Sequence, residues 1–302
     1  MLAAIDCGTN STRLLIRRGA TGETLVRANR ITRLGEWVAA SGQLSGTAIA
    51  RTVEAVRAFQ TLIEHHGAER VRVTATSAAR DAANRDDLFA AIADVVGVTP
   101  ELLTGDEEAA LSFRGATAGL PVDDDGPVLV IDIGGGSTEF IVGRGEEFES
   151  RSVDLGCVRL TELYVETDPP APEELHACIS VSQAWLDDVR RQLPEMSAAK
   201  TVVGVAGTVT TVAAVEIGLL EWSDEAIHHF RLTRDAVEDV FRTLATEARA
   251  DRIHNPGLED ARADVIVAGA AILAAFVRGL DLDEIVVSVA DILDGLVASL
   301  AD

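Results

Sequence analysis

A short pattern that occurs twice constrains the fold of this chain more than any other feature. Residues 5–16 read IDCGTNSTRLLI and residues 131–142 read IDIGGGSTEFIV, so Asp6 and Asp132 coincide when the segments are aligned without a gap. In each copy an apolar run ends in aspartate, a turn rich in glycine and hydroxyl residues follows, and a second apolar run begins. This order predicts a β-hairpin whose turn presents backbone N–H groups beside a carboxylate, an arrangement suited to phosphate oxygens and a divalent metal. Two such turns predict two half-domains that face one phosphate-binding cleft.

The predicted secondary structure also repeats. The first half gives three strands, a helix, a strand, a helix and a short strand, at residues 1–5, 11–17, 24–31, 45–66, 71–75, 78–96 and 100–103. The second half gives three strands, two helices, a strand and a helix, at residues 127–133, 138–143, 147–154, 157–166, 173–193, 202–207 and 208–218. Further helices are predicted at 234–251, 259–278 and 290–301, with a strand at 284–289. This alternation predicts a duplicated α/β architecture with mixed sheets covered by helices, and the acidic stretch PVDDDGP (121–127) is the predicted boundary.

Net charge limits the ligands that the general surface can bind. The chain carries 26 Lys and Arg residues against 49 Asp and Glu residues, a formal net charge of −23. Its long-range field repels polyanions, so no nucleic acid is expected as a partner. A phosphate-rich substrate would need a local reversal of charge by Mg²⁺ and a few arginines, with Arg80 and Arg159 as candidates.

Neither a secretory leader nor a membrane span is expected. The first residues, MLAAIDCG, lack a basic segment and a cleavage site, and the apolar stretch at 265–276 is too short to cross a bilayer. The three cysteines, Cys7, Cys157 and Cys178, have no metal-ligand spacing and fit a reducing compartment. We therefore expect a cytoplasmic protein with no membrane partner.

The glycine- and hydroxyl-rich turns provide the candidate phosphate-binding residues. An ordinary hairpin turn would explain either copy alone, but three consecutive glycines in the second indicate close approach of a ligand. A third turn, GVAGTVTT (204–211), precedes a helix and suits an anion or a nucleotide, although a tight strand-to-helix turn also explains it. The candidates are Gly8, Thr9, Asn10, Ser11, Gly134, Gly135, Gly136, Ser137, Thr138, Gly207 and Thr208.

Charged candidates follow two of the predicted strands. Arg80 comes after a strand end, where α/β sheets bind ligands, and can grip phosphate with two N–H groups; a solvated helix residue is the alternative. The segment TGDEEAALSFRGA (104–116) predicts a helix capped by Thr104, whose first-turn carboxylates favour the helix dipole. Because this helix leads from the first repeat toward the second, one of the carboxylates Asp106, Glu107 and Glu108 can also serve as a general base.

Six segments, taken in order, resemble a known family: IDCGTNSTRLL, TATSAARDAAN, TGDEEAALSFRGA, VIDIGGGSTEF, DLGCVRLTE with DPP, and ARADVIVAG. They resemble the exopolyphosphatase/guanosine pentaphosphate phosphohydrolase family of the actin–sugar kinase–Hsp70 superfamily. The resemblance implies two actin-like (ribonuclease H-like) domains around a cleft, at 1–120 and 121–289, with a helix at about 290–302 returning to the first. The chain has no His-Asp doublet and so resembles the short form, which lacks a C-terminal HD-type domain.

The resemblance also implies roles for individual residues. Glu108 matches the family base toward the attacking water better than its neighbour does. Asp132 and Glu139 match residues that bind or lie beside Mg²⁺, with Mn²⁺ as the alternative metal. The glycine turns and Arg80 match phosphate ligands.

The combined prediction is a Mg²⁺-dependent hydrolase that releases terminal orthophosphate from inorganic polyphosphate, with shorter chains preferred. Hydrolysis of guanosine pentaphosphate (pppGpp) is the alternative within the same class. A kinase that binds ATP in the same cleft, and a catalytically weak sensor of polyphosphate or ppGpp, are alternatives from other classes. The oligomeric state stays open, with a homodimer as the candidate assembly.

Overall fold

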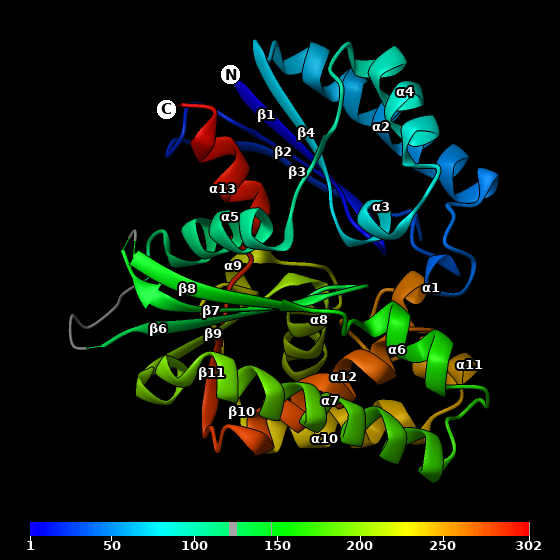
Figure 1. Cartoon of the computed structure of the whole chain (residues 1–302), viewed down its shortest axis with the longest axis vertical. Coiled ribbons are helices and arrows are strands. Elements are labelled where there is room, and N and C mark those ends of the chain that lie inside the picture. The colour runs from blue at the N-terminus through cyan, green and yellow to red at the C-terminus, as the bar shows by residue number, and fades with distance from the viewer. Residues whose placement is uncertain (121–125, 146, 302) are drawn as a thin grey trace. The chain divides into compact units, whose positions relative to one another are not determined.

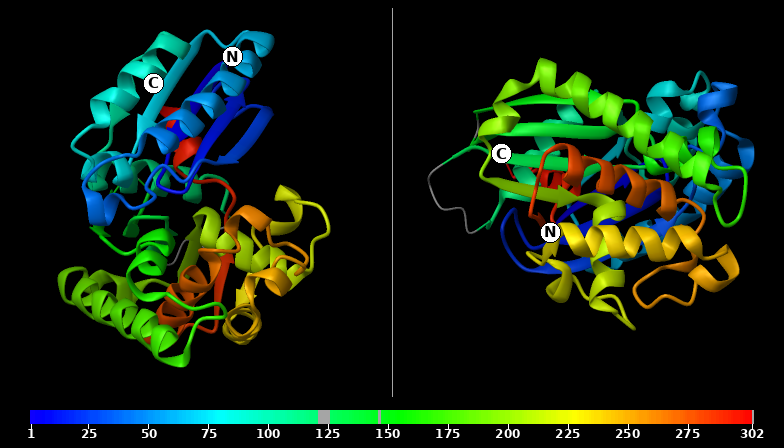
Figure 2. Two further views of the ribbon diagram at one scale, coloured as in Figure 1. Left: turned by 90° about the vertical axis from the view of Figure 1, so that its right-hand side faces the viewer. Right: turned by 90° about the horizontal axis from the view of Figure 1, so that it is seen from below.

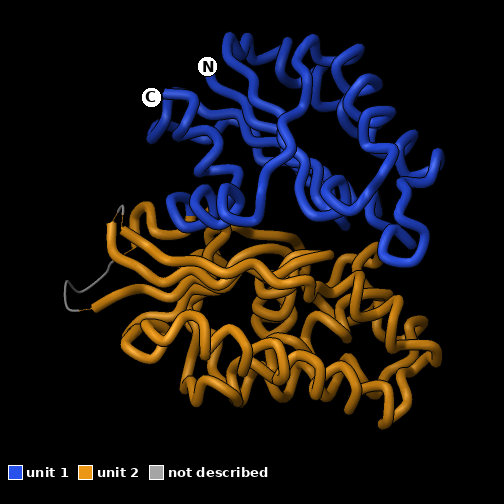
Figure 3. Tube along the Cα trace, viewed as in Figure 1, with its two compact units in different colours: residues 1–115, 291–302 blue, residues 116–290 orange. Residues whose placement is uncertain are grey.

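The computed structural model describes residues 1–120, 126–145 and 147–301. They form two compact units (Figure 3): Met1–Gly115 and Asp291–Asp302 form unit 1, and Ala116–Ala290 form unit 2. Residues 121–125 of the predicted boundary segment lie outside the described residues. None of the helices in the described ranges has the length and apolar composition that spanning a membrane requires.

The described part of unit 1 contains a five-stranded sheet in the order β3-β2-β1-β4-β5 (Figure 1). β1 pairs antiparallel with β2 and parallel with β4, so the sheet is mixed. The strands are β1 (Leu2–Cys7), β2 (Ser11–Arg17), β3 (Thr24–Ile31), β4 (Arg70–Ala75) and β5 (Glu101–Leu102). The helices are α1 (Val38–Ser41), α2 (Gly46–His66), α3 (Ser77–Asp81), α4 (Arg85–Val96), α5 (Gly105–Thr117, which runs on into unit 2) and α13 (Ile292–Ser299).

The described part of unit 2 contains a six-stranded sheet in the order β10-β11-β9-β6-β7-β8. The strands are β6 (Val128–Ile133), β7 (Thr138–Arg144), β8 (Glu147–Val153), β9 (Thr201–Val205), β10 (Arg231–Thr233) and β11 (Glu284–Val287). The α-helices are α6 (Cys157–Tyr164), α7 (Pro172–Gln192), α8 (Ala206–Ile217), α9 (Asp224–Ile227), α10 (Arg234–Thr246), α11 (Arg249–Arg252) and α12 (Ile266–Gly279). Two 3₁₀ turns are η1 (Pro194–Ala198) and η2 (Asp260–Arg262).

The two units share their strand order and register. The antiparallel pairs β1–β2 and β6–β7 close their turns at equivalent positions, Cys7 opposite Thr12 and Ile133 opposite Thr138. In each unit the first strand also pairs in parallel with a later strand, β4 or β9. The predicted α/β fold with a duplicated architecture is therefore confirmed.

Three helices predicted from the sequence are interrupted in the structure. The one predicted at 234–251 is broken by the extended Glu247, and the one at 259–278 is a 3₁₀ turn followed by α12. The third, at 78–96, shows why. Residues 78–96 were expected to form a continuous helix, but Ala82 is extended and separates α3 from α4. Hydrogen bonds to an earlier part of the chain keep this segment out of the helical conformation. The Ala83 N–H donates to the Gly42 carbonyl, and the Asn84 side chain forms two hydrogen bonds with the backbone of Leu44. These long-range bonds replace the helical bonds that the local sequence favours.

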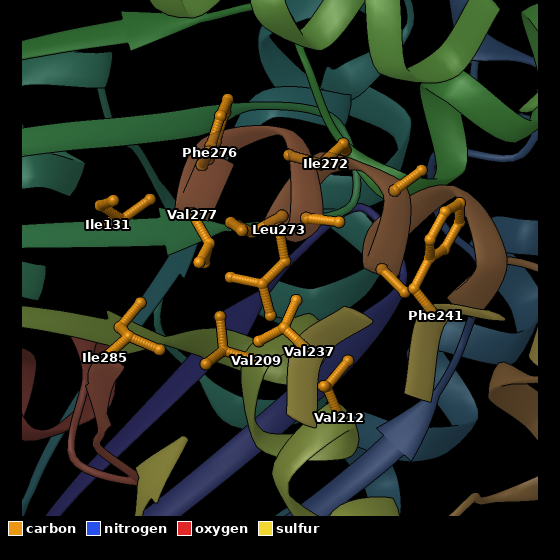
Figure 4. Packing of buried hydrophobic residues seen from close by; sticks show 14 of the residues in the cluster. Ile131, Val209, Val212, Val237, Phe241, Ile272, Leu273, Phe276, Val277 and Ile285 are labelled. Atoms are coloured by element: carbon orange, nitrogen blue, oxygen red, sulfur yellow. The ribbon is translucent and has the colours of Figure 1, made fainter. Parts of the chain in front are cut away.

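The core of unit 2 is built around α12. All residues from Ile266 to Val277 are buried, as expected for a helix that is apolar all round. Figure 4 shows Leu273 and Val277 of α12 among side chains of the sheet and of α8 and α10, including Val209 and Val237. The apolar stretch at 265–276 is thus the central helix of this core.

Two glycines allow α5 and α13 to touch backbone to backbone within unit 1. A Cβ atom on Gly115 would overlap the backbone carbonyl of Asp291, and one on Gly295 would overlap that of Leu111. α13, drawn in red, also packs on β1 and β2 (Figures 1 and 2). Arg17 and Arg27 of β2 and β3 pair with the buried Asp294 of α13, which fixes this helix to the sheet.

We expect Gly115→Ala to destabilise the protein. Alanine normally favours a helix over glycine by about 1 kcal/mol, but here the methyl group meets a backbone carbonyl that cannot swing aside. Overpacking of this kind costs about 1–3 kcal/mol, so the net effect is a lower urea midpoint. Gly46→Ala is the matched control, since Gly46 lies in the first turn of α2 and a Cβ atom there would meet no described atom within 4 Å. Equal urea midpoints for the two variants would contradict the prediction.

Candidate active site

The candidate residues of unit 1 follow the carboxyl ends of three neighbouring parallel strands. Gly8 follows β1, Arg80 lies on α3 after β4, and Glu108 lies on α5 after β5. Register pairs Cys7 with Ala75 and Ala75 with Leu102, so the three strands end at the same edge of the sheet. This is the edge at which α/β sheets bind ligands.

The first glycine turn is held in place by hydrogen bonds that its backbone carbonyl groups accept. Gly8 N–H donates to the Ser11 carbonyl at 2.9 Å, which closes the turn. The loop after β3 binds the other side: Gly35 N–H donates to the Thr9 carbonyl, and Thr32 and Arg33 N–H groups donate to the Asn10 carbonyl. Because C=O and N–H point in opposite directions across a trans peptide, the amides of Asn10 and Ser11 face away from that loop.

Buried polar atoms at this turn lack partners among the described residues. Both side-chain atoms Oδ1 and Nδ2 of Asn10 are buried without a hydrogen-bond partner there, and so is Oδ1 of Asp6. Unpartnered buried polar groups are rare and indicate an interaction that the protein chain alone does not supply. This is the structural feature at the first turn that best indicates a bound ligand.

The first residues of α6 hold the second glycine turn by donating hydrogen bonds to the carbonyl groups of the turn. The N–H groups of Cys157 and Val158 donate to the Gly134 and Gly135 carbonyls, and Arg159 Nε donates to the Gly136 carbonyl at 2.9 Å. By the same peptide geometry, the N–H groups that follow these carbonyls face away from α6. Arg159 Nε therefore supports the turn, and the phosphate contact expected for Arg159 stays a prediction.

Close backbone approach explains the glycine at position 156, which packs against this second turn. A Cβ atom on Gly156, the residue before α6, would overlap the backbone of Gly135 and Gly136. Thr138 Oγ1 donates to the Leu155 carbonyl at 2.6 Å, so this candidate phosphate ligand is engaged within the protein. The Thr138 hydroxyl fixes the strand that follows the turn.

The third turn lies at the same edge of the unit 2 sheet as the second turn. β6 and β9 run parallel with Asp132 opposite Val205, so Gly134 and Gly207 follow adjacent strand ends. A Cβ atom on Gly207 would overlap the Arg262 guanidinium, which places a cation against the start of α8. Gly269 of α12 lies close to both Thr208 and Cys157, which brings the starts of α8 and α6 together.

The equivalent positions beside the two turns differ in charge. In unit 1, Asp6 is opposite Arg13, whose Nη2 donates to Asp6 Oδ2 at 2.8 Å, and Arg13 also pairs with Asp291. Burial raises the pKa of Asp6, and Arg13 offsets part of that effect. In unit 2 the opposite pair is Asp132 and Glu139, two carboxylates on one face of the sheet and both buried. Glu139 accepts a hydrogen bond from Ser152 Oγ at 2.8 Å.

The structure separates the roles of Glu107 and Glu108. Glu107 accepts hydrogen bonds from Thr104 N–H and Oγ1, while its own N–H donates to Thr104 Oγ1, which forms a capping box. The Thr104 backbone N–H and hydroxyl hold the pKa of Glu107 below its usual value. Glu108 instead accepts a hydrogen bond from Arg80 Nη1 at 2.6 Å. Glu107 is thus committed to the helix end, and Glu108 is the carboxylate placed beside Arg80.

Comparison with known proteins assigns the family. The model of the Ppx/GppA phosphatase family matches residues 15–302. The chain belongs to the Ppx/GppA phosphatase family. It is similar to Exopolyphosphatase 2 of Mycobacterium tuberculosis, with 42% identity covering 99% of this chain and 98% of the relative. The crystal structure of a Ppx/GppA family member from Aquifex aeolicus matches with a TM-score of 0.82 and 30% identity, covering 99% of this chain and 96% of that one.

A more distant relative has a different named substrate. A guanosine-5'-triphosphate,3'-diphosphate pyrophosphatase of Photobacterium profundum is 30% identical over 98% of this chain, which spans 58% of that relative. The resemblance to the Ppx/GppA family inferred from six segments is therefore confirmed.

Sequence reasoning missed two residues of the Ppx/GppA candidate site. Arg13 and Arg262 were given no role, although both lie in segments that carry the family resemblance. The alignment of the two copies could have indicated Arg13. At this position the first copy has a cation, Arg13, and the second copy has a carboxylate, Glu139.

Proposed function

We propose that the chain is an exopolyphosphatase that hydrolyses inorganic polyphosphate with the help of a divalent cation. The observation that carries the proposal is the buried pair Asp132 and Glu139 beside the triple-glycine turn. Two adjacent buried carboxylates favour a cation between or beside them, and the turn offers N–H groups to an anion. A site that attracts both a cation and an anion suits a metal–phosphate substrate. The similarity to Exopolyphosphatase 2 supports the same activity.

The residues present fit Mg²⁺, with Mn²⁺ as the alternative. Mg²⁺ typically takes one or two protein carboxylates and completes its coordination with water and phosphate oxygens. Asp132 and Glu139 supply that number, and the described residues contain no group of three or more metal-ligating side chains. Arg13 neutralises Asp6 at the equivalent position of unit 1, so we propose that unit 2 holds the metal. When bound, the metal neutralises charge on the phosphoryl group.

The protein's own residues would perform the remaining chemistry. Glu108 orients a water molecule and takes its proton as the water oxygen bonds to the terminal phosphorus. The bond between that phosphorus and the bridging oxygen breaks, and the shortened polyphosphate leaves with the bridging oxygen. Amide N–H groups of the triple-glycine turn bind the nonbridging oxygens, whose charge must be stabilised in the transition state.

We expect Arg80→Ala to raise KM for polyphosphate at least several-fold. Arg80 lies beside Glu108, and a charge-assisted contact to phosphate contributes about 1.5–3 kcal/mol. Arg80→Lys should recover only part of the loss. The ammonium keeps the positive charge, but it cannot donate to two oxygens in one plane as a guanidinium does. Arg242→Ala is the control, since Arg242 is exposed and pairs with Asp239 on α10. Equal and small changes in KM for Arg80→Ala and Arg242→Ala would remove Arg80 from the phosphate site.

A phosphate-release assay tests the proposed function. Short polyphosphate, long polyphosphate, pppGpp and ATP are compared side by side with Mg²⁺. Faster release from polyphosphate than from pppGpp supports the proposal, and the reverse order assigns the chain to pppGpp hydrolysis, the activity in the name of the Photobacterium relative. Phosphate transfer that requires an acceptor would indicate a kinase, and tight binding without release would indicate a sensor.

A further inference from the structure

The proposed mechanism gives Arg80 and Glu108 separate tasks, but the structure pairs them with each other. Arg80 Nη1 donates to Glu108 Oε2 at 2.6 Å and to the Leu103 carbonyl at 3.0 Å. The two side chains are 23% and 12% exposed, so the pair is largely shielded from solvent. Arg80 would bind substrate phosphate, and Glu108 would bind the attacking water.

Each partner limits what the other can do while the pair is intact. A carboxylate oxygen that accepts a charge-assisted hydrogen bond is a weaker acceptor for water and a weaker base. A guanidinium that donates to a carboxylate has fewer N–H groups for phosphate. A largely buried carboxylate nevertheless needs a partner when no substrate is present, and Arg80 supplies it.

We propose that Arg80 is a cation shared between Glu108 and the substrate. This inference rests on the proposed function. A polyphosphate oxygen competes with Glu108 for the guanidinium, and its arrival releases the carboxylate to orient water. The bond to the Leu103 carbonyl anchors Arg80 near α5, so the exchange requires only a side-chain movement. Arg80 then acts as a positioning residue for Glu108 as well as a phosphate ligand.

A binding experiment without turnover tests the exchange. The probe is imidotriphosphate, whose bridging nitrogens resist hydrolysis, and its Kd is measured by calorimetry at constant Mg²⁺. Glu108→Gln should tighten binding by about three- to tenfold, because Arg80 no longer has to leave a carboxylate. In an Arg80→Gln background the same Glu108→Gln change should leave Kd nearly unchanged. An unchanged or weaker Kd for Glu108→Gln in the wild-type background would overturn the proposal.

The double-mutant comparison separates competition from simple charge repulsion. Loss of a nearby negative charge would strengthen anion binding equally with and without Arg80, and that additive result would also overturn the proposal. Arg80→Lys is the second background if Arg80→Gln does not fold. A lysine still pairs with the carboxylate, so Glu108→Gln should tighten binding there by a smaller factor than in the wild type, and an equal factor would count against competition.

A second Arg–Glu pair in the same unit gives a matched control. Arg72 Nη2 pairs with Glu101 Oε2 at 2.8 Å. Glu101→Gln should leave the Kd unchanged, and tightening equal to that of Glu108→Gln would mean that the effect is not specific to the site. Failure of the shared-cation proposal is distinguishable from failure of the function. An enzyme that releases phosphate but shows additive variants keeps its function and loses only this inference.

Discussion

Glu108→Gln is expected to lower kcat for polyphosphate hydrolysis by about 10²–10⁴ while substrate binding survives. Glutamine preserves the shape of the side chain but cannot accept the proton of the attacking water. The position supports this role, because Glu108 lies on the first turn of α5 beside Arg80. Steady-state kinetics with short polyphosphate, together with the Kd for imidotriphosphate, measure the two effects separately.

Glu107→Gln is the control for this prediction. Glu107 caps α5 through Thr104, and glutamine can also complete a capping box, so Glu107→Gln should change stability little and leave kcat nearly unchanged. A Glu108→Gln enzyme with near-normal kcat would show that another group activates the water. A large kcat loss in Glu107→Gln with an intact fold would mean that Glu107, and not Glu108, is the base.

Asp132→Asn and Glu139→Gln are expected to have the second largest effect. Each removes one of the two carboxylates beside the triple-glycine turn, so the metal concentration needed for half-maximal activity should rise by about 10–100-fold or more. Binding of Mn²⁺, followed by electron paramagnetic resonance, gives a readout that is independent of turnover. Glu149→Gln on β8, an exposed carboxylate, should change neither quantity.

The same titration tests the assignment of the metal to unit 2. Asp6→Asn should retain Mn²⁺ binding, because Arg13 already neutralises that carboxylate. Full activity in excess EDTA would contradict any metal requirement. Loss of Mn²⁺ binding in Asp6→Asn together with its retention in Asp132→Asn would place the metal at the first turn.

Local sequence patterns predicted the turns and most of the elements well. Glycine and hydroxyl residues between apolar runs are a local pattern for a hairpin, and the register of both turns agrees with the alignment of Asp6 with Asp132. The capping role of Glu107 was also readable, because Thr104-x-x-Glu107 is the pattern of a capping box.

Features that depend on distant partners could not be predicted from local patterns. The break between α3 and α4 depends on Gly42 and Leu44, which lie about forty residues earlier in the chain. Arg13 pairs with Asp291 across almost the whole sequence, and Arg262 meets Gly207 only after η2 folds onto α8. A single sequence gives no information about which of many arginines meets which carboxylate.

Unit 1 is formed from two segments that are far apart in the sequence, and this affects the order in which the chain folds during synthesis. Its N-terminal strands β1–β3 leave the ribosome first, but α13, which packs on β1 and β2, leaves after the whole of unit 2. Unit 2 is one continuous stretch and can bury α12 as soon as residue 290 has emerged. We therefore expect the later part of the chain to reach its native state first, the reverse of the usual vectorial order. The early strands would meanwhile be the segment most exposed to chaperones and to aggregation.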